Sequence, residues 1–373
     1  MEQQAPGQPR TAVLFRPFTC GSLRLHNRIV MAPMTRAKSP GGIPGADVAA
    51  YYQRRAAGGV GLIMSEGTYI GHPSAGFQPA VPNFHGAAAL AGWQRVIDQV
   101  HAAGGRMFPQ LWHVGLSMPA EDGPPPPHAL GPSGVGRSGE QIGAAMTQQQ
   151  IDEVVHAYGE AAAAAERLGF DGVEIHAAHG YLIDQFFWHK TNLRTDRYGG
   201  DLVARTRFAV EVIEQIRRRV PRDYPVCLRF SQWKLGDYAA RLAHSPEELE
   251  QFLRPLVAAG VDLFHCSQRR FWEAEFPGSD LNLAGWTQRL SGKPAITVGS
   301  ITLDTEFTTS FASAHSASVT GLDELLRRME RHEFELVAVG RSLIVNPSWA
   351  QIVQRGAMAE LRSFQRDVLQ HLS

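Results

Sequence analysis

The stretch Val173-Glu174-Ile175-His176-Ala177-Ala178-His179-Gly180-Tyr181 decides the fold and carries the candidate chemistry. It begins as a short apolar strand and ends in a cluster of titratable side chains, namely His176, His179 and Tyr181. In a chain that alternates strands with helices, these side chains fall at the carboxyl end of a strand. In a closed α/β barrel, ligands bind at that end. The sequence therefore predicts a functional site here.

Short apolar runs alternate with helical stretches along the chain; the helical stretches include residues 87–103, 148–168, 202–220 and 246–258. Such alternation indicates parallel βα units, and near-continuous apolar strands are typical of strands covered on both faces. Eight units favour an α/β fold closed into a (β/α)8 TIM barrel of one domain. The eight candidate strands are residues 28–32, 61–65, 106–111, 172–176, 226–230, 261–265, 295–298 and 336–339.

The chain before the first barrel strand is predicted in two parts. Residues 1–10 are polar and are expected to form a disordered tail, whereas residues 11–373 are expected to form the barrel domain. Residues 15–27 contain Pro17, Gly21 and alternating apolar side chains, which favours a short hairpin. We expect this hairpin to close the bottom of the barrel.

Composition narrows the functional class. The 373 residues carry no formal net charge and are 44% hydrophobic, which gives no reason to expect nucleic acid or an acidic membrane as a partner. No apolar run approaches the ~18 residues that span a bilayer, and the amino terminus lacks a signal segment. The three cysteines are scattered and odd in number, which excludes a disulfide framework. We expect a cytoplasmic protein, either a monomer or a homodimer.

The first three strands end in residues that can contact a ligand. Thr35, just past the first strand, can donate a hydroxyl to a ligand or cap a turn. Gly67, after the second strand, would let a flat ligand approach the backbone. Gln110 and Trp112 share one face of the third strand and would both point into the barrel mouth.

His176 and His179 admit three interpretations. They can bind a substrate oxygen, they can be structural, or they can ligate a metal in a TIM-barrel hydrolase. A metal needs three or four ligands, and the sequence offers no nearby Asp-x-His or Cys ligand to complete the set. The spacing also differs from the helical His-Glu-x-x-His pattern.

Cationic residues and glycines mark the later strand ends. Arg229 at the end of the fifth strand needs an anionic partner, either a reduced cofactor or an acid such as Glu174. The seventh strand ends in Gly299-Ser300 and the eighth in Gly340-Arg341. Loops after these two strands commonly bind phosphate in barrels, where glycine exposes backbone N–H groups and arginine forks around the anion. The sequence therefore predicts a phosphate-bearing ligand.

The loop over residues 267–282 follows the sixth strand and carries Phe271 and Trp272. A long loop with aromatic residues can close over a site as a lid. The alternative is simple packing of the two aromatic side chains against the rim of the barrel.

Four motifs together, and in this order, resemble the Old Yellow Enzyme family, and the resemblance covers about residues 14–356. That family consists of FMN-dependent ene-reductases built on a (β/α)8 barrel. The motifs are Asn27-Arg28-Ile29-Val30-Met31-Ala32-Pro33-Met34-Thr35-Arg36, Gln110-Leu111-Trp112-His113-Val114-Gly115, His176-Ala177-Ala178-His179-Gly180-Tyr181-Leu182 and Arg194-Thr195-Asp196-Arg197-Tyr198-Gly199-Gly200.

The resemblance implies a role for each matching residue. For the flavin, Thr35 would hydrogen-bond the carbonyl beside N5, with Pro33, Met34 and Gly67 alongside; Gln110 would hold the pyrimidine edge; Arg229 would stabilise negative charge on the reduced ring; and Gly299, Ser300, Gly340 and Arg341 would hold the phosphate. For the substrate, His176 and His179 would bind the carbonyl oxygen, Tyr181 would supply a proton, and Trp112 would shape the pocket. Phe271 and Trp272 lie on a loop that is not a feature of the best-known members, and their expected contact with the substrate follows from the length and aromatic content of that loop alone.

The implied reaction is ping-pong. NADH or NADPH reduces FMN, which then passes a hydride to the β-carbon of an α,β-unsaturated carbonyl compound or nitroalkene, while Tyr181 protonates the α-carbon. The expected substrates are thus small activated alkenes. A branch of the family with an iron–sulfur cluster is disfavoured, because the three cysteines are far apart. The segment Ser231-Gln232-Trp233-Lys234 departs from the best-known members and leaves the shape of the substrate mouth open.

Overall fold

The barrel is closed and consists of eight parallel strands, which confirms the predicted (β/α)8 fold. A computed structural model describes residues 10–117, 128–306 and 317–373. The strands neighbour one another in the order β10-β11-β12-β3-β4-β5-β8-β9, and β9 pairs again with β10 to close the ring. Each strand coincides with a predicted one: β3 (Ile29–Met31), β4 (Leu62–Tyr69), β5 (Arg106–Trp112), β8 (Val173–His179), β9 (Val226–Lys234), β10 (Leu263–Ser267), β11 (Ala295–Val298) and β12 (Leu336–Val339).

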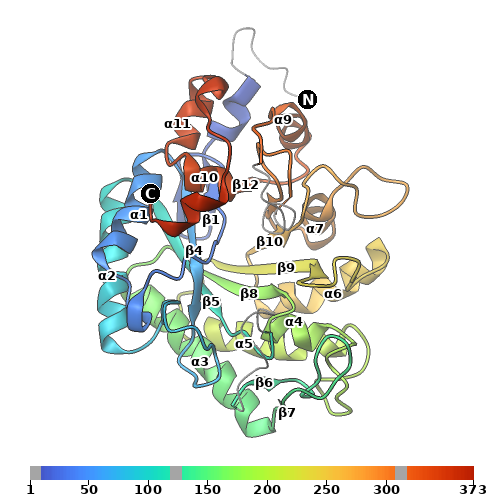
Figure 1. Cartoon of the computed structure of the whole chain (residues 1–373). Helices are drawn as coiled ribbons and strands as arrows, with labels where there is room; N and C mark the ends of the chain where they lie inside the picture. Colours follow the sequence, from blue (N-terminus) through green and yellow to red (C-terminus); the bar gives the residue numbers. More distant parts are fainter. Residues whose placement is uncertain (1–9, 118–127, 307–316) are drawn as a thin grey trace.

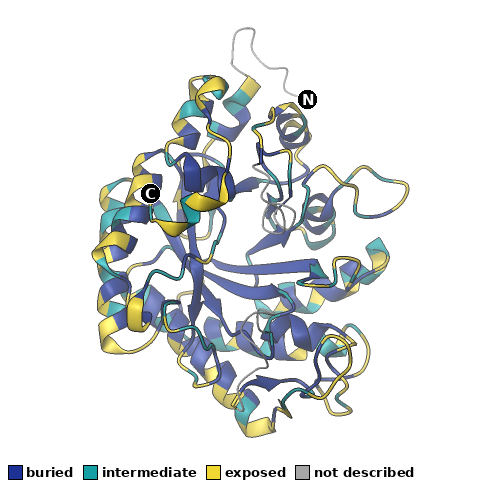
Figure 2. Cartoon of the chain, in the orientation of Figure 1, coloured by how far each residue is buried: buried dark blue, intermediate teal, exposed yellow. Residues whose placement is uncertain are grey.

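Helices surround the barrel on the outside (Figure 1). The strands are buried, whereas exposed residues lie on the outer surfaces of the helices and in loops (Figure 2). None of the helices in the described ranges is long and apolar enough to cross a membrane. The helices are α1 (Ala46–Ala57), α2 (Ala87–Ala102), α3 (Gln148–Arg167), α4 (Leu182–Phe187), α5 (Arg207–Arg217), α6 (Pro246–Ala259), α7 (Leu283–Ser291), α9 (Asp323–Glu330), α10 (Arg341–Val345) and α11 (Trp349–Gln354).

Local sequence signals set the helix ends. The hydroxyl of Thr147 accepts the N–H of Gln150, and the Gln150 side chain accepts the N–H of Thr147, which forms a capping box at the start of α3. At the start of α6, the Ser245 side chain accepts the backbone N–H of Glu248. At the other end, Gly260 caps the helix with a left-handed φ of 116°. These signals explain why both helices begin at the predicted residues.

The predicted hairpin is present and covers the amino end of the barrel. Strands β1 (Phe18–Cys20) and β2 (Leu23–Leu25) pair antiparallel. Phe18, Leu23 and Leu25 share one apolar cluster with inward-facing residues from the first half of the barrel strands, such as Leu62 and Leu263. Of the tail predicted over residues 1–10, all but the last residue lies outside the described ranges, and that residue begins the 3-10 helix η1 (Arg10–Phe15).

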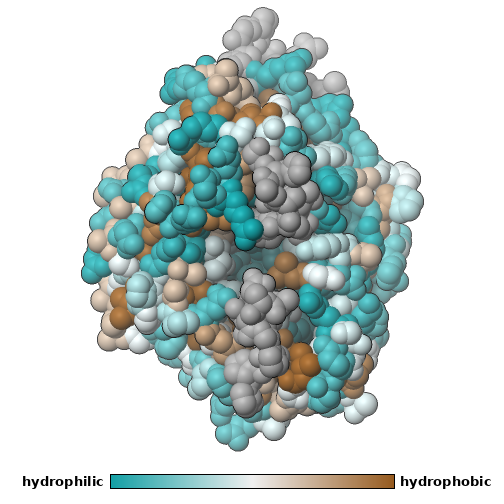
Figure 3. Space-filling view, viewed as in Figure 1, coloured by the Kyte–Doolittle hydropathy of each residue, from teal (hydrophilic) through white to brown (hydrophobic). Residues whose placement is uncertain are grey.

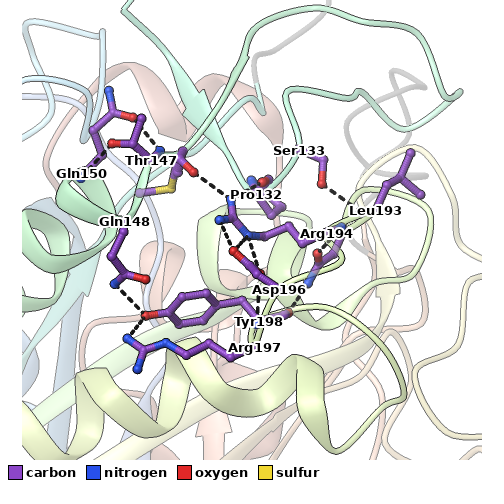
Figure 4. A network of polar contacts seen from close by, with 12 residues as sticks. Pro132, Ser133, Thr147, Gln148, Gln150, Leu193, Arg194, Asp196, Arg197 and Tyr198 are labelled. Carbon is purple, nitrogen blue, oxygen red and sulfur yellow. Dashed lines mark hydrogen bonds and ion pairs between the residues drawn. The ribbon is translucent and has the colours of Figure 1, made fainter.

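The motif over residues 194–200 fastens the outer loops rather than lining a cavity (Figure 4). Arg194 donates to the carbonyls of Pro132 and Met146, at 2.8 and 2.7 Å, and is ion-paired with Asp196. The Tyr198 hydroxyl bonds to side chains on both α3 and α5. These contacts tie the segment after α4 to the start of α3, so the motif stabilises the frame around the site.

The surface in Figure 3 mixes hydrophilic and hydrophobic residues. Among the coloured residues of that face, hydrophobic ones occur in small groups separated by hydrophilic side chains. Small scattered apolar groups are ordinary on soluble domains.

Candidate active site

A cavity of about 600 Å³ opens at the carboxyl ends of the barrel strands. This volume suits a small organic ligand. The structure brings most of the predicted site residues to its wall, from six different strands or the loops that follow them: Pro33, Met34, Thr35, Gln110, Trp112, His176, His179, Tyr181, Arg229, Gly299, Ser300, Gly340 and Arg341.

Four rings from β5, β8 and the start of α4 meet on one side of the cavity. The His176 and His179 rings contact each other edge to face, with centroids 5.2 Å apart. Tyr181 approaches His176 at 4.9 Å and Trp112 at 4.8 Å, also edge to face. Trp112 in turn stacks on His176 at 5.9 Å. The predicted histidine–tyrosine cluster is therefore assembled around a single wall.

The protonation states in this cluster follow from burial. Burial lowers the pKa of His176 and of His179 well below the ordinary value, and the nearby charge of Arg229 lowers both further. Both imidazoles are neutral at pH 7. Burial also raises the pKa of Tyr181 to about 12, so its phenol keeps its proton. His176 Nδ1 accepts the backbone N–H of Ala178 at 3.4 Å, which leaves the ring proton on Nε2.

Glu174 organises the polar floor beneath these rings. Its Oε1 accepts the Gln110 amide at 2.7 Å, and its Oε2 accepts His265 Nδ1 at 2.6 Å. Burial alone would raise the pKa of Glu174, but His265, Arg229 and Gln110 outweigh it and hold that pKa below the ordinary value. The fully buried Glu174 is thus ionised, and it orients the Gln110 amide.

Arg229 reaches the cavity with donor capacity to spare. Its Nη2 lies 3.4 Å from the Ser267 hydroxyl, which also contacts His179 Nε2 at 2.7 Å. Its Nε is buried and has no hydrogen-bond partner. Arg229 is absent from the ion pairs of the described residues, so a direct salt bridge with Glu174, one of the two alternatives, is not formed. A buried guanidinium with an unpartnered donor fits an anionic ligand edge.

The glycine-rich ends of β11 and β12 form the opposite side of the cavity. Gly299 has a φ of 144°, and a side chain there would collide with the backbone of the neighbouring loop, where Gln268 O would lie 2.8 Å from the added carbon. Arg341 begins α10 and donates to the carbonyl of Thr305. Burial lowers the pKa of Arg341 to about 10, which leaves it cationic at pH 7.

The loop after β3 is fixed by a buried carboxylate. Glu66 Oε2 accepts the backbone N–H groups of Arg36 and Ala37, each at 2.9 Å. These bonds hold the chain directly after Thr35, which lines the cavity at this point. Glu66 on β4 was not singled out from the sequence.

Gly67 has a different role from the one predicted. It does not border the cavity; the ring of Trp112 lies where its side chain would be, with Trp112 Cε3 2.5 Å from an added Cβ. The absence of a side chain at residue 67 therefore makes room for a protein side chain rather than for a flat ligand.

Phe271 and Trp272 also lie away from the cavity wall. Phe271 is buried in the main core, and its backbone N–H donates to the carbonyl of Gly299. Trp272 packs edge to face on Phe271 at 5.2 Å. Of the two interpretations of this loop, the structure supports packing, and the expected substrate contact of these two residues is not seen.

Some residues that line the cavity were not predicted from the sequence. Trp233 stacks on His179 with ring centroids 4.5 Å apart, and it belongs to the segment that departs from the best-known family members. Alternate side chains of a strand share one face, so the same pattern continued from Arg229 to the end of β9 would have placed Trp233 on the face of Arg229. Ser267, at the end of β10, also lines the cavity and was not predicted, because no local signal in the sequence marks it.

The geometry does not favour the metal-hydrolase alternative. Within the part of the chain that the structure describes, no group of three or more His, Cys, Asp or Glu side chains is placed to hold a metal ion. The neighbours of His176 and His179 are instead aromatic rings, a serine hydroxyl and Arg229.

Comparison with known proteins defines the class. A model of the NADH:flavin oxidoreductase / NADH oxidase family matches residues 13–360, and the chain belongs to this family. The match confirms the resemblance to the Old Yellow Enzyme family inferred from the four motifs.

Particular relatives can then be named. The chain is 38% identical over 243 residues to 12-oxophytodienoate reductase 7 of rice (Oryza sativa subsp. japonica), a match that covers 60% of each protein. It is 32% identical over 363 residues to the NADH oxidase of Thermoanaerobacter brockii, covering 94% of this chain and 52% of that one. The matches thus span little more than half of either relative's length.

Solved structures show the same fold. A complex of morphinone reductase with tetrahydroNAD superposes with a TM-score of 0.77 at 28% identity, over 95% of this chain and 93% of that one. The Old Yellow Enzyme of Pichia sp. AKU4542 has a TM-score of 0.78 at 24% identity, over 97% and 91% of the two chains, and is similar in fold.

Proposed function

We propose that the protein is an FMN-dependent ene-reductase that takes reducing equivalents from NADH or NADPH. The observation that carries the proposal is the convergence of two neutral histidines and a protonated tyrosine on one wall of a cavity whose floor holds a buried cation, Arg229. Its relatives include proteins named 12-oxophytodienoate reductase and NADH oxidase, which supports a redox activity on small molecules.

The residues present fit FMN. Gln110 carries an amide oriented by Glu174, which suits a ring edge with adjacent donor and acceptor groups. Arg229 has a buried, unpartnered Nε, which suits an edge that becomes anionic. The glycines at residues 299 and 340, together with Ser300 and Arg341, supply a phosphate cradle on the far side of the cavity. Thr35 would contact the ring from the end of β3. FMN, when bound, supplies the two-electron chemistry that links a nicotinamide to an alkene.

The chain's own residues bind and protonate the substrate. The neutral His176, with its proton on Nε2, donates a hydrogen bond to the substrate's carbonyl or nitro oxygen, and His179 lies beside it. These donors stabilise negative charge that develops on the oxygen, and one such donor is typically worth ~2.7–4 kcal/mol of barrier. Tyr181 then delivers its phenolic proton to the α-carbon. Trp112 and Trp233 confine the ligand between them and the cavity floor.

The substrates we propose are small α,β-unsaturated carbonyl compounds and nitroalkenes, since the polar donors cluster at one point of a largely aromatic wall. The choice between NADH and NADPH is left to a comparison of the two as reductants. The cytoplasmic location and the monomeric or homodimeric state stay predictions.

Identification of the released cofactor tests the proposal. The protein is purified, denatured, and the supernatant analysed by absorption and mass spectrometry. We expect FMN at close to one per chain, because the cavity has one cradle for a single phosphate. FAD, or no flavin after incubation with FMN, would contradict the assignment.

A variant locates the phosphate. Arg341→Ala should weaken FMN binding by roughly 10- to 100-fold, which corresponds to the ~1.5–3 kcal/mol of a charged hydrogen bond. The control is Arg270→Ala, which removes a half-exposed arginine from the nearby loop, ion-paired with Glu273 and outside the cavity wall. Equal FMN affinity in the two variants would remove Arg341 from the phosphate site.

A further inference from the structure

The turn that presents His179 and Tyr181 has an uncommon backbone. His179 has a φ of 66° and Gly180 a φ of 83°, both in the left-handed region. Residues with a side chain seldom adopt this region, and such conformations persist where the surroundings determine them. The register between β8 and β9 also shifts between Ala177 and His179. Something must therefore hold this turn.

Every backbone polar group of His179, Gly180 and Tyr181 is hydrogen-bonded. The turn is thus fixed from β8, β9 and α4 at once, and the donors and acceptors include three side chains. The bonds are His179 N to Ser231 Oγ at 3.0 Å, Leu235 N to His179 O at 3.3 Å, Gly180 N to Asp184 Oδ2 at 2.6 Å, Gln185 Nε2 to Gly180 O at 2.8 Å, Tyr181 N to Ala178 O at 3.3 Å and Gln185 N to Tyr181 O at 2.7 Å.

A buried ion pair stands behind this turn. Lys234 Nζ donates to Asp184 Oδ1 at 2.7 Å, and the side chains of both residues are fully buried. Lys234 Nζ also lies 3.3 Å from the carbonyl of Ser231, the residue that accepts the N–H of His179. Asp184 accepts the N–H of Gly180 with its other oxygen. The pair therefore links Asp184, which accepts the N–H of Gly180, to the backbone of Ser231, whose hydroxyl accepts the N–H of His179.

Lys234 belongs to the segment over residues 231–234 that departs from the best-known family members. A lysine at the end of a barrel strand need not point at a ligand, and this one does not border the cavity. An ion pair without solvent is costly unless its geometry and further hydrogen bonds offset the loss of hydration. Such a pair is therefore expected where it determines a local conformation.

We propose that Asp184 and Lys234 are positioning residues, which hold the turn at residues 179–181 so that His179 and Tyr181 face the ligand. This inference rests on the proposed roles of those two side chains. Asp184 acts through the Gly180 N–H, and Lys234 acts through Asp184 and the Ser231 carbonyl. Neither residue touches the ligand.

The charges around the pair set its response to pH. Asp184 faces Lys234 and the Gly180 N–H; Lys234 faces Asp184, with Asp237 and His179 in its surroundings. Burial raises the pKa of Asp184, and Lys234 opposes that rise. With Lys234 removed, Asp184 would be neutral at low pH and would become a buried, unpaired anion as the pH rises. The turn in such a variant should loosen with increasing pH.

The first experiment uses Lys234→Met in the FMN-loaded enzyme. The probe is para-chlorophenol, whose affinity is read from the long-wavelength absorbance it produces over a flavin, between pH 6 and pH 9. We expect FMN content to be retained and phenol affinity, relative to the wild-type enzyme at the same pH, to fall increasingly as the pH rises. The rate of enone reduction should drop by up to the order of 10²-fold, the scale of a small misplacement of a catalytic group.

Two double variants separate positioning from folding. Asp184→Asn with Lys234→Met removes both charges and keeps an oxygen for the Gly180 N–H, whereas Asp184→Ala with Lys234→Met removes the charges and the oxygen. Neither leaves a buried unpaired charge. The Asn variant should bind the phenol more tightly and reduce the enone faster than the Ala variant. For both, the affinity relative to the wild-type enzyme should not change with pH, whereas for Lys234→Met it should.

The outcomes distinguish this inference from the proposed function. Equal phenol affinities and enone rates in the Asn and Ala variants, or a Lys234→Met enzyme that matches the wild-type affinity and rate at every pH, would overturn the positioning role. Absence of phenol binding in the wild-type holoenzyme would instead overturn the proposed function. The control is Arg328→Met, which breaks the buried ion pair with Glu333 away from the cavity and should lower stability without changing phenol affinity.

Discussion

The indole of Trp233 stacks on the imidazole of His179, with ring centroids 4.5 Å apart and planes inclined by 28°. Its Nε1 donates to the carbonyl of Ser267 at 3.1 Å, and the hydroxyl of Ser267 lies 2.7 Å from His179 Nε2. Trp233 therefore confines one face of His179 and borders the cavity at the same time.

This contact predicts which tryptophan governs substrate size. Trp233→Ala should raise kcat/KM for bulky enones relative to small ones, because it widens the cavity, while FMN content stays constant. Trp272→Ala is the matched control, since Trp272 lies on the packed loop outside the cavity wall and should leave that ratio unchanged. A ratio that responds to Trp272 and not to Trp233 would restore the lid interpretation of the loop.

Tyr181→Phe should slow only the half-reaction with the alkene. We expect a loss on the order of 10²–10⁴ for a poorly activated enone, the usual scale of general acid catalysis. Reduction of the enzyme by the nicotinamide needs no proton from Tyr181 and should continue. Because the pKa of Tyr181 is raised to about 12, the wild-type alkene step should keep its proton donor throughout pH 6–9. Rapid-mixing traces of both half-reactions decide; equal slowing would assign Tyr181 to ligand positioning.

Glu174→Gln should shift the flavin potential upward. The change removes a buried negative charge next to Arg229, while a glutamine can still accept from Gln110 and can donate to His265 Nδ1 once the ring proton of His265 moves to Nε2. The uncompensated cation then favours the reduced, more negative ring. A shift of roughly +30 mV would correspond to about 1.4 kcal/mol for a two-electron couple. Potentiometric titration measures it, and a negative shift would contradict the electrostatic role of Glu174.

His113 should contribute to loss of stability in acid. It is fully buried between Ser74 and the Gly115 N–H, and burial lowers its pKa to about 3. The unfolded chain, with an ordinary histidine pKa of about 6.5, binds the proton first as the pH falls. Stability is therefore complete above pH ~6.5 and declines toward pH 3, by at most about 1.4 kcal/mol per pH unit for this residue. Denaturant unfolding of His113→Asn should show a lower stability at pH 7.5 but a shallower decline; an unchanged slope would exclude His113.

The barrel could be predicted from the sequence because its signals are local and repeated. An apolar run such as residues 226–230 indicates a buried strand, and a capping residue such as Thr147 indicates the start of a helix. The cluster of His176, His179 and Tyr181 was predictable for the same reason, since the three residues lie on one strand end. The contacts between residues on different strands and helices could be seen only in the structure.

Glu174, Gly67 and Phe271 show why the remainder could not be predicted. The bonds from Glu174 to Gln110 and His265 join β8 to β5 and β10, and nothing near residue 174 in the sequence indicates them. The meaning of Gly67 depends on the rotamer of Trp112, 45 residues later in the chain and on the adjacent strand. Phe271 was assigned to the cavity from its loop alone, whereas the packing of that loop directs it into the core.

The hairpin of β1 and β2 has a consequence for how reactants exchange. Its apolar side chains seal the amino end of the barrel, so reactants enter and leave the cavity at the carboxyl end. For the proposed reaction, the nicotinamide and the alkene would compete for the same position above His176 and His179 and must take turns there. An excess of either reactant would then delay the other, and turnover would depend on the ratio of the two concentrations rather than on either one alone.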